Sequence, residues 1–260
     1  MLRQIGQKKN FSFAGHARHN RRVEIEIGAF LNANGILLGG IFGLARREPI
    51  PVRTQFFFRN AIGAFAVFFA VRLIYESVGG SFSSCLKQIF LALLAVALGF
   101  WIGKLLGFQK FSNRLGRIAG STIAAPQNPT EGFNACAILF CAAPLGIVGA
   151  ITDGLSDYFY FLAVKAVMDA LAMISFVRIF RWPCALSAIP VFIFFSAISL
   201  ACQIYAKPFL NSHGLTNSVN AAAGFIALTV AVVIFEIRKV ELANYLPALA
   251  VAPLLTWLLK

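Results

Sequence analysis

Charged residues are scarce in this chain. They make up 13% of its 260 residues, whereas hydrophobic residues make up 59%. A soluble domain of ordinary composition has about a quarter charged residues. The mean hydropathy is +0.77, and the few charges lie between long apolar runs. This scarcity argues against a soluble globular domain and predicts a protein that crosses a membrane several times.

The sequence also lacks the spacings of common catalytic and metal sites. It has no CxxC pair, no HExxH, no GxSxG and no haem-spaced histidine pair. We therefore expect no catalytic residue, no metal and no cofactor, and we do not expect an enzyme. We interpret the cysteines as small apolar fillers of the helix bundle. The cysteines and histidines are Cys85, Cys136, Cys141, Cys184, Cys202, His16, His19 and His213.

Acidic residues are few, and the net charge is +13. Such an excess is also found in nucleic-acid-binding proteins, but the basic residues here lie at the ends of apolar runs. No soluble face interleaves basic and aromatic residues. We therefore expect membrane lipids as partners and no nucleic acid.

The apolar runs are about 20 residues long, which suits a membrane helix, whereas a barrel strand needs about 10. We predict an all-α, polytopic transmembrane bundle of about eight spans. The last run contains Pro247 and Pro253, and the count is seven if it is re-entrant. The expected spans are about 25–44, 56–76, 86–106, 132–152, 158–177, 184–206, 219–236 and 243–259.

Basic residues in the loops predict the orientation. Twelve Lys and Arg lie in the loops after spans one, three, five and seven, against three on the other side. The positive-inside rule makes the first set cytoplasmic. Residues 1–22 contradict this, because they carry six basic residues and no acid. Either they stay inside and invert the bundle, or they are not in the natural protein. We expect residues 1–22 to be a basic tail that is disordered or not in the natural protein, and 23–260 to be a single transmembrane domain.

Two further patterns concern packing. Phe108, Phe111, Leu115 and Ile118 repeat at helical spacing and predict a short interfacial amphipathic helix near 108–118. Two glycine stripes at intervals of four predict close helix contacts, within the bundle or in a homo-oligomer. The stripes are Gly35, Gly39 and Gly43 in span one, and Gly99, Gly103 and Gly107 in span three.

Charged residues inside apolar runs predict where a function would lie. Lys165 and Asp169 are four residues apart, on one face of span five, where each offsets the other's charge. We expect this pair to face the bundle interior and to meet Glu131 or Asp153 of span four. Pro144, with glycines beside it, predicts a loosened middle for span four, as in transporter helices that expose backbone groups.

We therefore predict a secondary transporter of a small solute or ion. The alternative is a non-transporting structural or sensory protein whose polar residues only determine helix packing. The candidate binding residues are Glu131, Asp153, Lys165, Asp169, Asn32 and Asn34.

Several segments resemble a known bacterial membrane family, domain of unknown function five-five-four. They are "LNANGILLGGIFG", "TEGFNACAILFCAAPLGIVGAITDGL", "KAVMDA", "SAIPV" and "NYLPALAVAPLL". The resemblance covers about residues 25–260 and implies a multi-pass inner-membrane protein. It also implies that Glu131, Gly132, Asp153, Gly154, Lys165 and Asp169 belong to the family pattern. This chain departs from that pattern at Ala170, where glycine is usual.

Overall fold

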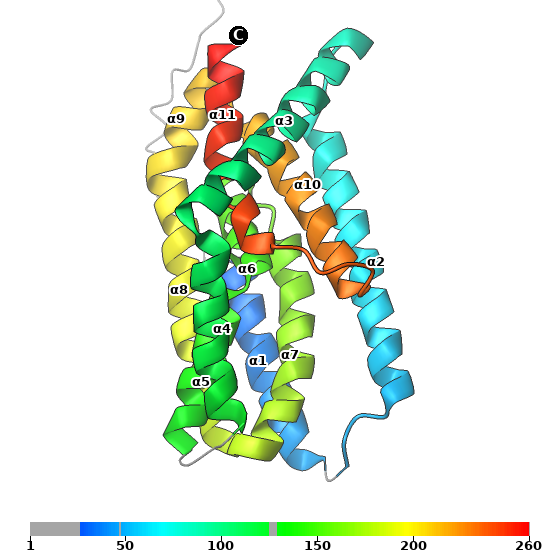
Figure 1. Cartoon of the computed structure of the whole chain (residues 1–260), viewed down its shortest axis with the longest axis vertical. Coiled ribbons are helices and arrows are strands. Elements are labelled where there is room, and N and C mark those ends of the chain that lie inside the picture. The colour runs from blue at the N-terminus through cyan, green and yellow to red at the C-terminus, as the bar shows by residue number, and fades with distance from the viewer. Residues whose placement is uncertain (1–26, 47, 125–128, 260) are drawn as a thin grey trace, which may run out of the picture.

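A computed structural model describes residues 27–46, 48–124 and 129–259, so the tail 1–22 lies outside it. These residues form helices and no strands (Figure 1). The helices are α1 (Ile27–Ala45), α2 (Val52–Ser77), α3 (Phe82–Leu106), α4 (Phe108–Ala124), α5 (Pro129–Ala142), α6 (Pro144–Ser156), α7 (Tyr160–Phe180), η1 (Trp182–Ser187), α8 (Ala188–Ala201), η2 (Cys202–Ala206), α9 (Lys207–His213), α10 (Thr216–Ile234), η3 (Leu242–Tyr245) and α11 (Ala248–Leu258).

The all-helical membrane fold is confirmed. Six segments within the described residues are long and apolar enough to cross a membrane, and the bent pair α5–α6 makes a seventh. The segment Trp182–His213 joins η1, α8, η2 and α9 into 32 residues, longer than the predicted 184–206. The predicted last span is a shorter apolar stretch, Leu242–Leu258, with Pro253 inside α11. The structure is therefore close to the seven-span form of the prediction.

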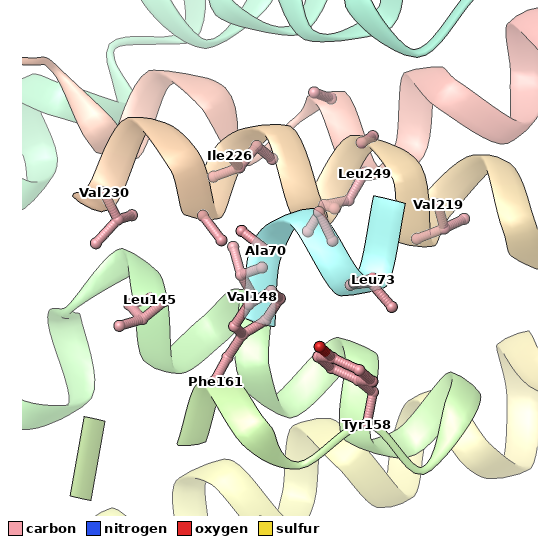
Figure 2. Close-up of a cluster of buried hydrophobic side chains, with 14 of the residues drawn as sticks. Ala70, Leu73, Leu145, Val148, Tyr158, Phe161, Val219, Ile226, Val230 and Leu249 are labelled. Atoms are coloured by element: carbon pink, nitrogen blue, oxygen red, sulfur yellow. The ribbon is translucent and has the colours of Figure 1, made fainter. Parts of the chain in front are cut away.

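Helices α6 and α7 separate two buried cores. One core lies among α2, α3, α6, α7, α10 and α11. Figure 2 shows part of it, with Ala70 of α2, Val148 of α6, Phe161 of α7 and Ile226 of α10 close together. The other core lies among α1, α5, α6, α7, η1 and α8. Phe161 of α7 belongs to the first core and Leu162 to the second, so α7 contacts both cores.

The fourth predicted span is broken, as its proline suggested. Helices α5 and α6 meet at an angle of 59°. Ala143 between them is extended, with φ −68° and ψ 120°, which is the conformation that a following proline favours. Pro144 begins α6 and has no N–H, so the Phe140 carbonyl loses its helical donor. The break therefore exposes a helix C-terminus and a helix N-terminus inside the protein.

The glycine stripes lie against neighbouring backbones. A side-chain carbon at Gly35 would come 2.5 Å from the Ala166 carbonyl oxygen of α7, and one at Gly39 would collide with the backbone of Ala170. Gly43 lies against Val177 and Ile174. The family departure at Ala170 is thus at the contact with Gly39, where α1 is close enough to touch the α7 main chain.

The second stripe packs in the same way at two of its three positions. Gly99 lies against Ala248 and Gly103 against Asn244. Gly107 makes no close contact with another helix, so the packing prediction is wrong at this position. Its φ is +74°, it ends α3, and the nearest atom to an added side-chain carbon is Lys110 Cδ at 3.9 Å. Gly107 therefore serves the left-handed turn at the helix end.

The predicted amphipathic helix is present and longer than expected. Helix α4 runs to Ala124 rather than stopping near 118. It follows α3 and continues beside α5 (Figure 1). Phe108, Phe111 and Ile118 are exposed on it. Its place at a leaflet surface stays a prediction.

Candidate functional site

The Lys165–Asp169 pair lies inside the bundle. Lys165 is 2% exposed and Asp169 is 6% exposed. Lys165 Nζ donates to Asp169 Oδ2 at 2.5 Å. The two residues are one helical turn apart on the side of α7 that faces the second core, because Leu162 and Met173 of the same side belong to that core. The pair therefore faces protein and not lipid.

Asn32 of α1 completes this group. Its side chain is fully buried, and Nδ2 donates to Asp169 Oδ2 at 2.9 Å. One carboxylate oxygen thus accepts from both Lys165 and Asn32. The Asn32 carbonyl oxygen, Oδ1, is buried and has no hydrogen-bond partner in the structure. A buried acceptor left unpaired costs about 1–3 kcal/mol, so this atom favours any bound group that can donate to it.

The break between α5 and α6 lies beside Lys165. Nζ is 5.6 Å from the ring centre of Phe140, in the last turns of α5, and 5.5 Å from that of Phe195, in α8. A side-chain carbon at Gly146, in the first turn of α6, would come 2.6 Å from Lys165 Cε. The ammonium group therefore lies near the negative end of the α5 dipole and over two aromatic rings, which both favour a cation.

Asp153 binds α1 and not the ion pair. Its Oδ2 accepts from the Gly28 N–H at 3.2 Å, in the first turn of α1. The first N–H groups of a helix have no partner within the helix and carry partial positive charge, so the carboxylate is stabilised there. Gly28 and Asn32 are one turn apart on α1. Helix α1 thus connects Asp153 to the Lys165–Asp169 pair, and the expected contact between Asp153 and Lys165 is replaced by this arrangement.

Two predicted site residues lie apart from this group. Glu131 is in the first turn of α5, and its neighbour Gly132 packs on Phe180. Phe180 is eleven residues beyond Asp169, about 16 Å along α7 at 1.5 Å per residue. Asn34 donates to the Phe30 carbonyl oxygen of its own helix at 2.8 Å. We therefore correct the predicted site by leaving out Glu131 and Asn34, because the bend of span four does not bring Glu131 to the pair and Asn34 turns away from it.

The corrected group is Asn32, Lys165 and Asp169. Asp153 of α6 binds α1 at Gly28, one turn before Asn32. Sequence reasoning missed Phe140 and Phe195, because two among 27 phenylalanines carry no signal. Gly146 had a usable signal, since it lies two residues after the proline that breaks the span. The group offers a carboxylate, an ammonium and an unpaired amide oxygen beside an interrupted helix.

The chain is similar to two curated proteins. One is the uncharacterized membrane protein YdfK of Bacillus subtilis (strain 168), 23% identical over 233 residues, which are 89% of this chain and 96% of that protein. The other is the uncharacterized protein YqgA of Escherichia coli (strain K12), 23% identical over 232 residues, 87% of this chain and 94% of that protein. No solved structure matches the chain. The model of the family described as "Protein of unknown function (DUF554)" matches residues 27–257, and the chain therefore belongs to this family.

Proposed function

We propose that this chain is a secondary transporter of a small solute or ion in the cytoplasmic membrane, with no enzymatic activity. The observation that carries the proposal is the buried group of Lys165, Asp169 and Asn32 beside the α5–α6 break. Each charge in the apolar layer costs about 2.5–3.5 kcal/mol on insertion scales, and an apolar pair packs as well or better. A function that needs the charges explains why the chain keeps them.

The unpaired amide oxygen supports binding over packing alone. A group that served packing only would be expected to satisfy all its buried polar atoms. Asn32 Oδ1 has no partner, and it belongs to the same amide that donates to Asp169. A bound cation, a protonated amine or a hydroxyl group would give the Asn32 Oδ1 atom the partner that it lacks. We propose that such a group, or a proton shared with Asp169, is what the site takes up.

The broken span supports movement. Transporters commonly place their sites where a membrane helix is interrupted, because the freed backbone groups and helix ends contact the substrate. Here the 59° bend lies next to Lys165. The ion pair is closed off in this conformation, so transport requires an opening, and the junction at Ala143 and Pro144 is the element that can change its angle without breaking helical hydrogen bonds.

Thermal unfolding of the purified chain with a panel of solutes tests the proposal. The panel comprises monovalent cations, amines, amino acids and organic anions. A ligand at about 100 times its Kd raises the free energy of unfolding by about 2.7 kcal/mol. We expect at least one solute to stabilise the native chain and not the Lys165→Met/Asp169→Leu variant.

The matched control is Arg72→Met/Glu76→Leu. This removes another pair four residues apart, Arg72 Nε to Glu76 Oε1 at 2.7 Å, which is exposed near the end of α2. We expect this control to respond to the same solute as the native chain does. A panel that stabilises no form of the chain, or that stabilises the Lys165→Met/Asp169→Leu variant equally, would favour the structural or sensory alternative.

A further inference from the structure

Three sulfur atoms meet in the second core, one turn from the ion pair. Cys184 Sγ lies 3.6 Å from Met173 Sδ. Cys136 lies in the same buried core, beside Cys184. All three side chains are fully buried, and they come from α5, α7 and η1. The three residues are far apart in sequence and meet only in the folded chain, so their spacing gives no sequence motif.

Two thiols and a thioether are soft sulfur ligands, and this chemistry determines which metal ion the cluster would bind. The described residues bring no three His, Cys, Asp or Glu side chains together for a metal ion, but a thioether is also a ligand for soft metals. Thiolate and thioether sulfurs select Cu(I), whereas Zn²⁺ takes four ligands from cysteine, histidine and carboxylate. We infer that Cys136, Met173 and Cys184 form a binding site for a thiophilic monovalent cation, Cu(I) in chemical class.

The geometry fits such an ion. Metal–sulfur bonds of about 2.3 Å, the length of a zinc–thiolate bond, place two sulfur ligands about 4 Å apart in a trigonal or tetrahedral site. The observed 3.6 Å between Cys184 and Met173 is a few tenths of an ångström shorter. A small outward turn of the Cys184 or Met173 side chain therefore brings these two sulfur atoms to the separation that a bound ion requires.

Charge balance also suits the apolar surroundings. One of the two thiols gives its proton to solvent as the metal binds, and the resulting thiolate cancels the single positive charge of the cation. The other thiol and the thioether bind as neutral ligands. The site then carries no net charge, which is the form that a buried apolar environment tolerates. No electron is transferred in this step.

The sulfur cluster is placed toward the end of α7 that carries basic residues. Cys184 follows the chain reversal at Arg181, and its thiol donates to the Arg181 carbonyl oxygen at 3.0 Å. The predicted topology puts this end in the cytoplasm, where thiols stay reduced. A reduced pair of thiols can bind a cation, whereas a disulfide cannot. The inference does not depend on transport.

Binding is tested on the full chain in detergent, in a background where the remaining cysteines are replaced (Cys85→Ser, Cys141→Ala and Cys202→Ala). Cu(I) is titrated without oxygen against the competing chelator bicinchoninate, and Ag(I) serves as a probe that does not change oxidation state. We expect one ion per chain. Cys184→Ser should abolish binding, and Met173→Leu, which conserves volume, should weaken it at least tenfold.

The matched control is Met168→Leu. Met168 is on the same helix, packs against the other core and lines a pocket that contains none of the three sulfur residues. We expect it to bind Cu(I) as the background chain does. The inference fails if the reduced background chain takes up no ion, or if Met173→Leu and Cys184→Ser bind as tightly as Met168→Leu. It also fails if mass spectrometry finds Cys136 and Cys184 joined in a disulfide after purification under reducing conditions.

Discussion

At Asp169 a single carboxylate oxygen holds α1 and α7 together. It accepts from Lys165 on its own helix and from Asn32 on α1. The loss of the Lys165–Asp169 ion pair and the loss of the Asn32 hydrogen bond have different consequences. Removing either charge strands the other in a buried environment, whereas removing Asn32 leaves the ion pair intact. The energetics of the three residues therefore predict different mutational outcomes.

Single neutralisation should be worse than double neutralisation. Lys165→Met or Asp169→Leu alone leaves an uncompensated buried charge and should lower the free energy of unfolding by about 3–5 kcal/mol. The double variant should recover most of this loss. Thermal unfolding in detergent measures both. A double variant as unstable as the single ones would mean that the pair itself supplies the stability.

Asn32 and Asn34 provide a matched comparison on one helix. Asn32→Leu removes a hydrogen bond to a charged acceptor and should cost about 1.5–3 kcal/mol. Asn34→Leu removes a bond to its own helix and should change stability by about 0.5 kcal/mol or less. Chemical unfolding of both variants tests the assignment. Equal losses would contradict the placement of Asn32 in the site and of Asn34 outside it.

At the scale of the elements, close backbone contact joins α1 to α7. Gly35 and Gly39 bring the α1 main chain onto Ala166 and Ala170. These contacts bracket Asp169 in sequence, so the interface that holds the two helices also sets the distance between Asn32 and the carboxylate. The break at Pro144 then places Phe140 and Gly146 against the same lysine.

Enlarging Gly39 tests this interface. Gly39→Leu should lower the free energy of unfolding by at least about 3 kcal/mol, because a side chain there collides with the Ala170 backbone. Gly116→Leu on α4 is the control, since nothing lies within 4 Å of an added carbon there. It should be neutral or slightly stabilising. If both variants unfolded at the native temperature, the stripe would not be a packing surface.

For the whole molecule, the membrane fold and the buried pair were predictable from sequence, but the partners of the pair were not. Composition and run length predict membrane helices, and a proline predicts the break at Ala143. The angle of that break and the neighbours of Lys165 depend on packing between distant segments. The structure therefore places Glu131 away from Asp169, and it joins Asn32 to Asp169 by a hydrogen bond that no sequence pattern predicts.

Topology is the prediction that belongs to the whole molecule. A reporter fused after Arg47 should report the cytoplasm, because the basic loops gather on that side. Deleting residues 1–22 should leave insertion and expression unchanged. If the fusion reports the outside in the full chain and the cytoplasm after the deletion, the basic tail governs orientation and the proposed orientation is wrong for the chain as given.

The central claim is that the buried pair serves transport and not packing alone. Its most direct test is uptake into proteoliposomes of the solute that stabilises the native chain. Three forms are compared: the native chain, Lys165→Met/Asp169→Leu and the exposed-pair control Arg72→Met/Glu76→Leu. We expect the native chain and the control to take up the solute at similar rates, and the Lys165→Met/Asp169→Leu form, although folded, to take up none above empty liposomes. Full uptake by that folded double variant would contradict the claim.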